Sequence, residues 1–164
     1  MLRCGSVRNI IAVMSKPIGR LVLAGVALLA TGLWGVPARE RLAGPVEARL
    51  LEVIDGDTIR VRARIWLGQE VETLVRLAGV NAPELTAPCP EERTLARAAQ
   101  QLLARSLGPG ELRLTEIQND KYGGRVIATV RTASGADPGD ALLKAGLARA
   151  YEGGRRSSWC ASGE

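Results

Sequence analysis

Apolar and polar residues alternate along much of the chain between residues 46 and 77, the period of strands with one buried face. Residues 46–54 are apolar enough for a first strand, and apolar side chains alternate with arginines over 59–65. A third alternating segment covers 71–77. Turns at Asp55-Gly56-Asp57 and Leu67-Gly68-Gln69 separate the three segments, so the pattern predicts a three-stranded meander.

From residue 90 the apolar period becomes helical. Pro90 and two acids begin a helix that Gly108 ends, and its apolar stripe is Leu95, Ala98, Ala99, Leu102 and Leu103. Two further strands are expected at 112–117 and 126–132, and Asp137-Pro138 begins a second helix that runs through Leu147. The order β-β-β-α-β-β-α predicts a mainly β fold with α, a five-stranded OB-fold barrel with two helices over residues 46–164.

The first 38 residues differ from the rest in composition. Four basic residues precede an apolar run over 21–36, and the first acid is Glu40. The run has 16 residues, short of the ~20 that span a bilayer comfortably. Residues 1–38 are therefore predicted to be a signal peptide or an N-terminal membrane anchor, followed by a linker over 39–45. Either alternative predicts an exported protein, periplasmic or secreted.

The charge of the whole chain comes mainly from this leader. There are 22 Lys and Arg against 17 Asp and Glu, a net charge of +5. The leader holds four of the cations and none of the acids, so residues 39–164 carry only +1. Charge alone therefore does not predict a nucleic-acid surface, and binding must be argued from individual residues.

Cysteine and histidine content limits the chemistry. Of three cysteines, Cys4 lies in the leader, which leaves Cys89 and Cys160 as a hypothetical disulfide in an oxidising compartment. The chain has no histidine. Histidine metal sites, Cys-His nucleophiles and Ser-His-Asp triads are thereby excluded, and a general base has to be a carboxylate.

Two acids, an amide and two guanidiniums form a candidate phosphodiester site. Asp57 and Asn81 offer hard oxygens to a divalent cation, Glu84 offers a base, and Arg76 and Arg125 offer planar donors for phosphate oxygens. Each residue also has an ordinary interpretation. Asp-Gly is a common turn, Arg76 is able to pair with a surface glutamate, and the arginines at 60, 62 and 64 fit a solvated strand face or a phosphate track.

Three segments in order resemble the staphylococcal nuclease (thermonuclease) family. They are Asp55-Gly-Asp-Thr58, Arg76-Leu-x-Gly-Val-x-Ala-Pro-Glu84 and Asp120-x-Tyr-Gly-Gly-Arg125. The resemblance covers roughly residues 46–151 and implies an OB-fold enzyme that cleaves DNA and RNA with Ca²⁺, leaving 3′-phosphates.

The resemblance also implies a role for each matching residue. Asp57 matches a calcium ligand, Glu84 the carboxylate that acts on water, and Arg76 and Arg125 the phosphate-binding arginines. Ala82 matches a residue whose backbone carbonyl contacts the metal. Tyr122 and Tyr151 lie near positions that contact nucleotide in the family.

The chain departs from the family pattern at three places. Asn81 stands where the family has a second calcium carboxylate, which predicts weaker calcium binding. An extra glycine precedes Arg125, and the chain continues only briefly after Cys160 where the family has a third helix. A Cys89–Cys160 bridge is one way to hold this shorter end.

The sequence therefore predicts a monomeric, metal-dependent nuclease, with Ca²⁺ as the expected ion and backbone phosphates of DNA or RNA as the contacted groups. The alternative is a catalytically weak or silent OB-fold module that binds nucleic acid or protein. Asn81 favours the alternative, and the trio of Arg76, Glu84 and Arg125 favours the enzyme. A structural envelope protein held through residues 21–36 is a third possibility.

Overall fold

A computed structural model describes residues 40–160. The predicted leader over 1–38, with its apolar run at 21–36, lies outside the described residues. Within 40–160 no helix is long and apolar enough to cross a membrane.

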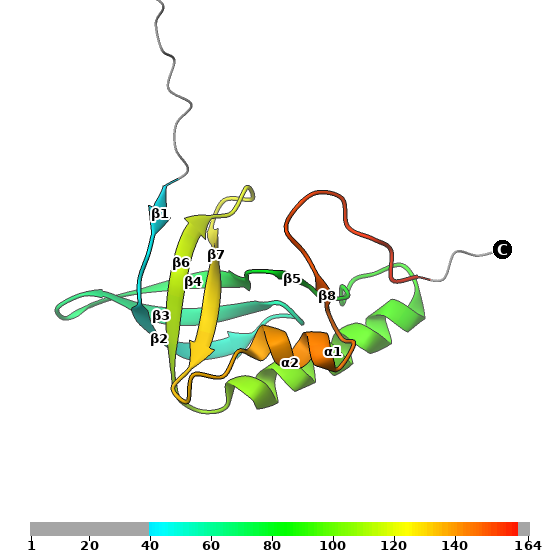
Figure 1. Ribbon diagram of the computed structural model, residues 1–164, viewed down its shortest axis with the longest axis horizontal. Coiled ribbons are helices and arrows are strands. Elements are labelled where there is room, and N and C mark those ends of the chain that lie inside the picture. Colours follow the sequence, from blue (N-terminus) through cyan, green and yellow to red (C-terminus); the bar gives the residue numbers. More distant parts are fainter. Residues whose placement is uncertain (1–39, 161–164) are drawn as a thin grey trace, which may run out of the picture. The chain divides into compact units, whose positions relative to one another are not determined.

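The centre of the fold is a closed β-barrel of five strands (Figure 1). Its strands are β2 (Val46–Val53), β3 (Thr58–Trp66), β4 (Gln69–Leu77), β6 (Glu111–Asn119) and β7 (Arg125–Thr132). Neighbours pair in the order β6-β2-β3-β4-β7, and β7 pairs with β6 to close the barrel. All of these pairings are antiparallel except β4–β7. The structure confirms the predicted five-stranded OB-fold barrel with two helices.

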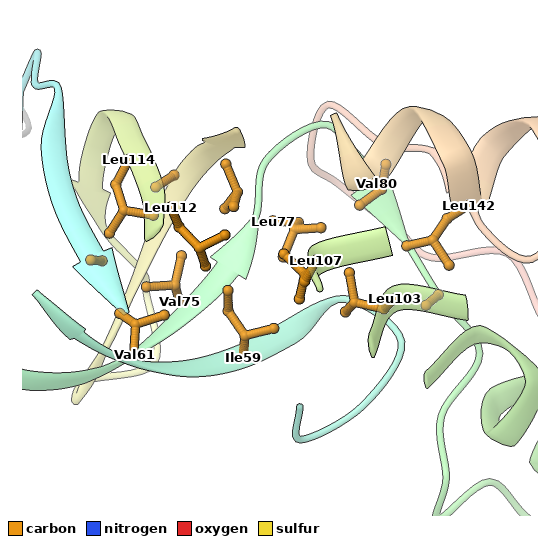
Figure 2. Packing of buried hydrophobic residues seen from close by; sticks show 14 of the residues in the cluster. Ile59, Val61, Val75, Leu77, Val80, Leu103, Leu107, Leu112, Leu114 and Leu142 are labelled. Carbon is orange, nitrogen blue, oxygen red and sulfur yellow. The ribbon is translucent and has the colours of Figure 1, made fainter. Parts of the chain in front are cut away.

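The barrel interior is filled by the apolar positions of the alternating strands (Figure 2). Ile59 and Val61 of β3, Val75 of β4, and Leu112 and Leu114 of β6 are almost fully buried. Each such side chain contributes about 1.5–3 kcal/mol through burial. The predicted alternation therefore corresponds to burial at 59, 61 and 63 of β3 and at 75 and 77 of β4.

Two helices cover one end of the barrel, α1 (Pro90–Leu107) and α2 (Pro138–Lys144). Leu103 and Leu107 of α1 meet Leu142 of α2 in the same core (Figure 2). The Asp137 carboxylate accepts hydrogen bonds from the amides of residues 139 and 140, which caps α2. The prediction for α2 was too long. The chain leaves the helix after Lys144 and turns through Gly146, whose φ of +67° favours glycine.

The β3–β4 hairpin extends beyond the core. Ile65, Trp66 and Leu67 at its tip are 56%, 71% and 88% exposed, so the strict alternation predicted there does not correspond to burial. Along β3 the arginines pair with glutamates of neighbouring strands, Arg60 with Glu52 and Arg64 with Glu47. These arginines therefore form a solvated, ion-paired strand face.

Three short strands were not predicted. β1 (Arg41–Leu42) falls inside the predicted linker and pairs with the end of β6. β5 (Val80–Asn81) pairs with β8 (Arg149–Ala150), which joins the segment after β4 to the segment after α2. Two-residue strands have no detectable alternation, so only the fold identifies them.

After β8 the chain forms an irregular segment, residues 151–160, which we call the strap. Its last residue, Cys160, forms the predicted disulfide with Cys89, immediately before α1. The amide of Tyr151 donates to the carbonyl of Gly79 at 2.9 Å. The strap is thus attached at both ends.

Candidate functional site

The Asp55-Gly56-Asp57 turn is held against α1. Ile54 and Asp55 donate their amides to the carbonyl of Thr58, which makes the turn between β2 and β3. The Gln100 side chain of α1 donates to the carbonyls of Val53 and Ile54 at 3.1 and 2.9 Å. A Cβ at Gly56 would lie 2.6 Å from that of Ala82, so only glycine allows this close approach.

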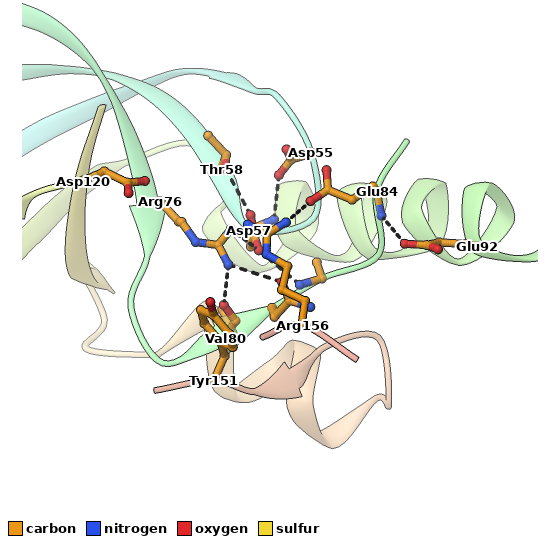
Figure 3. A network of polar contacts seen from close by, with 12 residues as sticks. Asp55, Asp57, Thr58, Arg76, Val80, Glu84, Glu92, Asp120, Tyr151 and Arg156 are labelled. Atoms are coloured by element: carbon orange, nitrogen blue, oxygen red, sulfur yellow. Dashed lines mark hydrogen bonds and ion pairs between the residues drawn. The ribbon is translucent and has the colours of Figure 1, made fainter. Parts of the chain in front are cut away.

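Arg76 and Asp57 form a buried ion pair at the end of the barrel (Figure 3). Nη1 of Arg76 lies 2.5 Å from Oδ2 of Asp57, and the two side chains are only 7% and 6% exposed. Nη2 of Arg76 also donates to the carbonyl of Val80 at 3.0 Å. The interpretation that Arg76 pairs with a surface glutamate is therefore wrong. β4 carries its side chain into the covered end of the barrel.

Asn81 and Ala82 lie beside this pair. Oδ1 of Asn81 accepts a long contact of 3.5 Å from Nη2 of Arg76. The amide of Ala82 donates to Oδ2 of Asp57 at 3.1 Å, and its side chain is buried. β5 therefore places Asn81 beside Arg76, and the residue after β5, Ala82, beside the Asp57 carboxylate.

Glu84 is positioned by α1 and by the strap. Its amide donates to Oε1 of Glu92 at 3.1 Å, and Glu92 is a buried residue of the first turn of α1. Its carboxylate is about half exposed and accepts from Nη1 of Arg156 (Figure 3). Although partial burial opposes the effect, the carboxylates of Glu84 and Asp57 raise the pKa of Arg156.

Three carboxylates converge at the start of β3. Burial, followed by the charge of Asp57 and more weakly that of Glu84, raises the pKa of Asp55 to about 6. Carboxylate oxygens are the ligands that a hard divalent cation prefers, and its charge would relieve repulsion between Asp55 and Asp57, the second of which also faces Arg76. The donors fit Ca²⁺ in kind, with Asp55 and Asp57 as carboxylates and Asn81 as an amide.

Arg125, the second predicted phosphate-binding arginine, also has a carboxylate partner. Its Nε and Nη2 lie 2.7 and 2.6 Å from Oδ2 of Asp120. Burial alone would raise the pKa of Asp120, but the hydrogen bond and charge of Arg125 hold that pKa below its ordinary value. Gly124, the extra glycine of the sequence, has a φ of +80° in the turn that returns Arg125 to Asp120.

A cavity of about 430 Å³ unites the arginine side of the site. Arg76, Arg125 and Arg156 line it together with Tyr122 and Tyr151, the two predicted nucleotide contacts. The Arg76 guanidinium lies 5.9 Å from the Tyr151 ring centre, and that of Arg125 lies 5.8 Å from the Tyr122 ring centre. The cavity thus has cationic and aromatic walls, as a phosphate beside a sugar or base requires.

Sequence reasoning assigned no role to three residues of this site, Asp55, Asp120 and Arg156. Asp55 and Asp120 belong to the same motifs as Asp57 and Arg125, so the sequence could have indicated that these two acids are part of the site. Arg156 lies in a segment without periodicity, and no local pattern could have identified it.

Comparisons with known proteins identify the family of the chain. A family model described as "Staphylococcal nuclease homologue" matches residues 74–159, just over half of the chain. Asp57 precedes the matched segment, whereas Arg76, Glu84, Arg125 and Arg156 lie within it.

Two curated proteins are also similar. They are called "Uncharacterized endonuclease" and come from Escherichia coli and Escherichia coli O157:H7. Each is 25% identical over 111 residues, which is 68% of this chain. The chain spans 65% of the length of these relatives.

Proposed function

Because this chain belongs to the staphylococcal nuclease homologue family, we propose that it is a nuclease that hydrolyses phosphodiester bonds of DNA or RNA. The observation that carries the proposal is the convergence of Arg76, Arg125 and the Asp55–Asp57–Glu84 carboxylates at one end of the barrel. The endonuclease names of the two Escherichia coli relatives support the same activity.

The side chains divide the work by their chemistry. Glu84, a half-exposed carboxylate, accepts a proton from the attacking water or orients that water. Arg76 and Arg125 bind phosphate oxygens and stabilise the charge that grows on them in the transition state. Attack on phosphorus with departure of the 5′-oxygen leaves a 3′-phosphate, the product expected from the family resemblance.

Asp57 and Asn81, with Asp55 beside them, would hold Ca²⁺. When bound, this ion would neutralise phosphate charge and make phosphorus more susceptible to attack. The neutral amide of Asn81 contributes one negative charge fewer than a carboxylate, so we expect modest calcium affinity. Ala82 is proposed to add its backbone carbonyl, as the family resemblance implies, and its amide places this residue next to Asp57.

The test is a nuclease assay on the purified full chain with denatured DNA, in Ca²⁺ and in chelator. We expect cleavage only in Ca²⁺, and Glu84→Gln should lower the rate by about 10²–10⁴ because the base is lost. Glu91→Gln is the matched control, since Glu91 is an exposed glutamate of the nearby first helical turn. A Glu84→Gln protein as active as this control would refute the role given to Glu84.

Calcium binding is tested separately by titration calorimetry, which does not depend on turnover. Asn81→Asp should tighten calcium binding, because it restores a carboxylate beside Asp57. Unchanged affinity would place the ion elsewhere.

A binding module is the second candidate. Two observations favour a protein that holds nucleic acid without cutting it. Asn81 is neutral, and Arg76 and Arg125 are already paired with carboxylates. Wild-type protein that binds an oligonucleotide tightly but leaves it intact in Ca²⁺ would establish this alternative.

We also propose that the nuclease works outside the cytoplasm, as the predicted leader implies. The Cys89–Cys160 disulfide supports this location, because disulfides persist in oxidising compartments. Fractionation of cells that express the full chain, followed by mass spectrometry of the mature N-terminus, tests export and leader cleavage together.

A further inference from the structure

Arg156 contacts the candidate site from a segment that belongs neither to the barrel nor to a helix. Its Nη1 donates to Glu84 (Figure 3). Its side chain lines the same cavity as Arg76 and Arg125. The side chain is 37% exposed, so it is reachable by a ligand in the cavity.

The strap that carries Arg156 is fastened close to this residue on both sides. On the N-terminal side the amide of Tyr151 donates to the carbonyl of Gly79 at 2.9 Å. On the C-terminal side Cys160 is bonded to Cys89, and the Arg149 guanidinium lies 3.9 Å from the Trp159 ring centre and donates to the carbonyl of Ser158 at 3.0 Å. These contacts limit how far the strap can carry Arg156 from the cavity.

The disulfide fixes the partner of Arg156 as well. Sγ of Cys160 lies 3.4 Å from Oε2 of Glu92, whose other oxygen accepts the amide of Glu84. Cys89 is also the residue immediately before α1, the helix that contains Glu92. One covalent link therefore positions both Arg156 and Glu84.

The charges of the cavity favour a phosphate near Arg156. Arg76 and Arg125 each already face a carboxylate, Asp57 and Asp120 respectively, at 2.5 and 2.6 Å. A guanidinium has five N–H donors, and the hydrogen bond of Arg156 to Glu84 uses one nitrogen. Arg156 also faces a carboxylate, but at 37% exposed it is the most accessible of the three guanidiniums, against 7% for Arg76 and 21% for Arg125, so its remaining donors are available to a ligand.

We propose that Arg156 is a third phosphate-binding arginine, held at the cavity by the disulfide-fastened strap. The ligand is a backbone phosphate of single-stranded nucleic acid, and the inference rests on the proposed function of this site. Arg156 supplies a planar donor pair from the strap side of the phosphate, opposite the donors that come from the barrel.

The experiment measures binding of a fluorescent single-stranded oligonucleotide with phosphorothioate linkages, in chelator, by anisotropy. In the full chain with its cysteines intact, Arg156→Gln should weaken binding about tenfold, as loss of a charged hydrogen bond does. The slope of log affinity against log salt should fall by about 0.7, the value for one phosphate contact on a single strand. Arg155→Gln is the matched control, because Arg155 is exposed and does not line the cavity.

A second experiment distinguishes direct contact between Arg156 and phosphate from neutralisation of Glu84 by Arg156. If Arg156 binds phosphate, its replacement should lower the salt slope equally when Glu84 is already glutamine. A slope change that disappears in the Glu84→Gln background would mean that Arg156 only neutralises Glu84, and would overturn the proposal.

The role of the disulfide is tested in the Cys89→Ser/Cys160→Ser protein, once circular dichroism has shown that it is folded. Binding should weaken about as much as in Arg156→Gln, and adding Arg156→Gln should then change affinity less than about twofold. A full tenfold effect of Arg156→Gln in this background would show that the disulfide does not position the arginine.

The outcomes distinguish this inference from the proposed function. Wild-type protein that binds through Arg156 but never cleaves would refute the nuclease and support the inference. Active protein in which Arg156→Gln binds like Arg155→Gln would overturn the inference alone. Faster cleavage by Arg156→Gln at unchanged affinity would also overturn it, since Arg156 would then restrain Glu84 instead of binding substrate.

Discussion

The two ion pairs on either side of the candidate site are built in opposite ways. The Arg76–Asp57 pair is almost fully buried and lies at the ends of strands whose backbones are fixed by the barrel. The Arg156–Glu84 pair is 37% and 47% exposed and depends on an irregular strap. The barrel-side pair is therefore rigid and carries a desolvation cost, whereas the strap-side pair is solvated and able to rearrange.

The largest loss of stability is expected when the barrel-side arginine, Arg76, is removed. Arg76→Ala should destabilise the fold by about 3–5 kcal/mol, because the Asp57 carboxylate would remain buried without its partner. Urea denaturation measures the change. Arg60→Ala, which removes the exposed pair with Glu52, is the control and should shift stability by less than about 1 kcal/mol. Equal losses in the two variants would contradict the contrast.

The next largest effect is expected from the disulfide. The Cys89→Ser/Cys160→Ser protein should lose about 2–4 kcal/mol, because the bond closes a long loop of 71 residues in the unfolded chain. Urea denaturation of the oxidised wild type and of the variant gives this difference. Two free thiols found by non-reducing mass spectrometry of exported wild-type protein would contradict this prediction, because the disulfide would then be absent.

The carboxylate cluster predicts a pH dependence of stability. The pKa of Asp55 is raised to about 6 in the folded protein from 3.8, so folding favours its protonated form. The contribution of Asp55 should be most favourable below about pH 4 and should be lost as pH rises through about 6. Urea midpoints measured in chelator across this range should fall less with pH in Asp55→Asn. An identical profile for both proteins would contradict the raised pKa.

The smallest effect on stability is expected on the strap side. Arg156→Gln should change the free energy of unfolding by less than about 1 kcal/mol, since both partners are substantially exposed and screened. The same urea measurement checks it beside Arg76→Ala. A loss as large as that of Arg76→Ala would show that the strap-side pair is structural, like its barrel-side counterpart.

The sequence alone determined the five strands of the barrel and the presence of both helices. The two-residue period at 59–65 and 71–77 and the helical stripe after Pro90 arise from neighbours along the chain, so they were visible without the structure. The motif residues Asp57, Arg76 and Arg125 could also be identified as candidates, because their spacing resembles that of a known family.

The tertiary structure decided which arginine meets which carboxylate. Arg76 alternates like a surface residue but is buried, because β5, Tyr151 and the Asp57 turn cover the end of its strand. Arg156 reaches Glu84 from 72 residues away along a segment that has no period. Such contacts depend on barrel closure and on the Cys89–Cys160 bond, both of which join distant parts of the chain, and local patterns of hydrophobicity do not encode them.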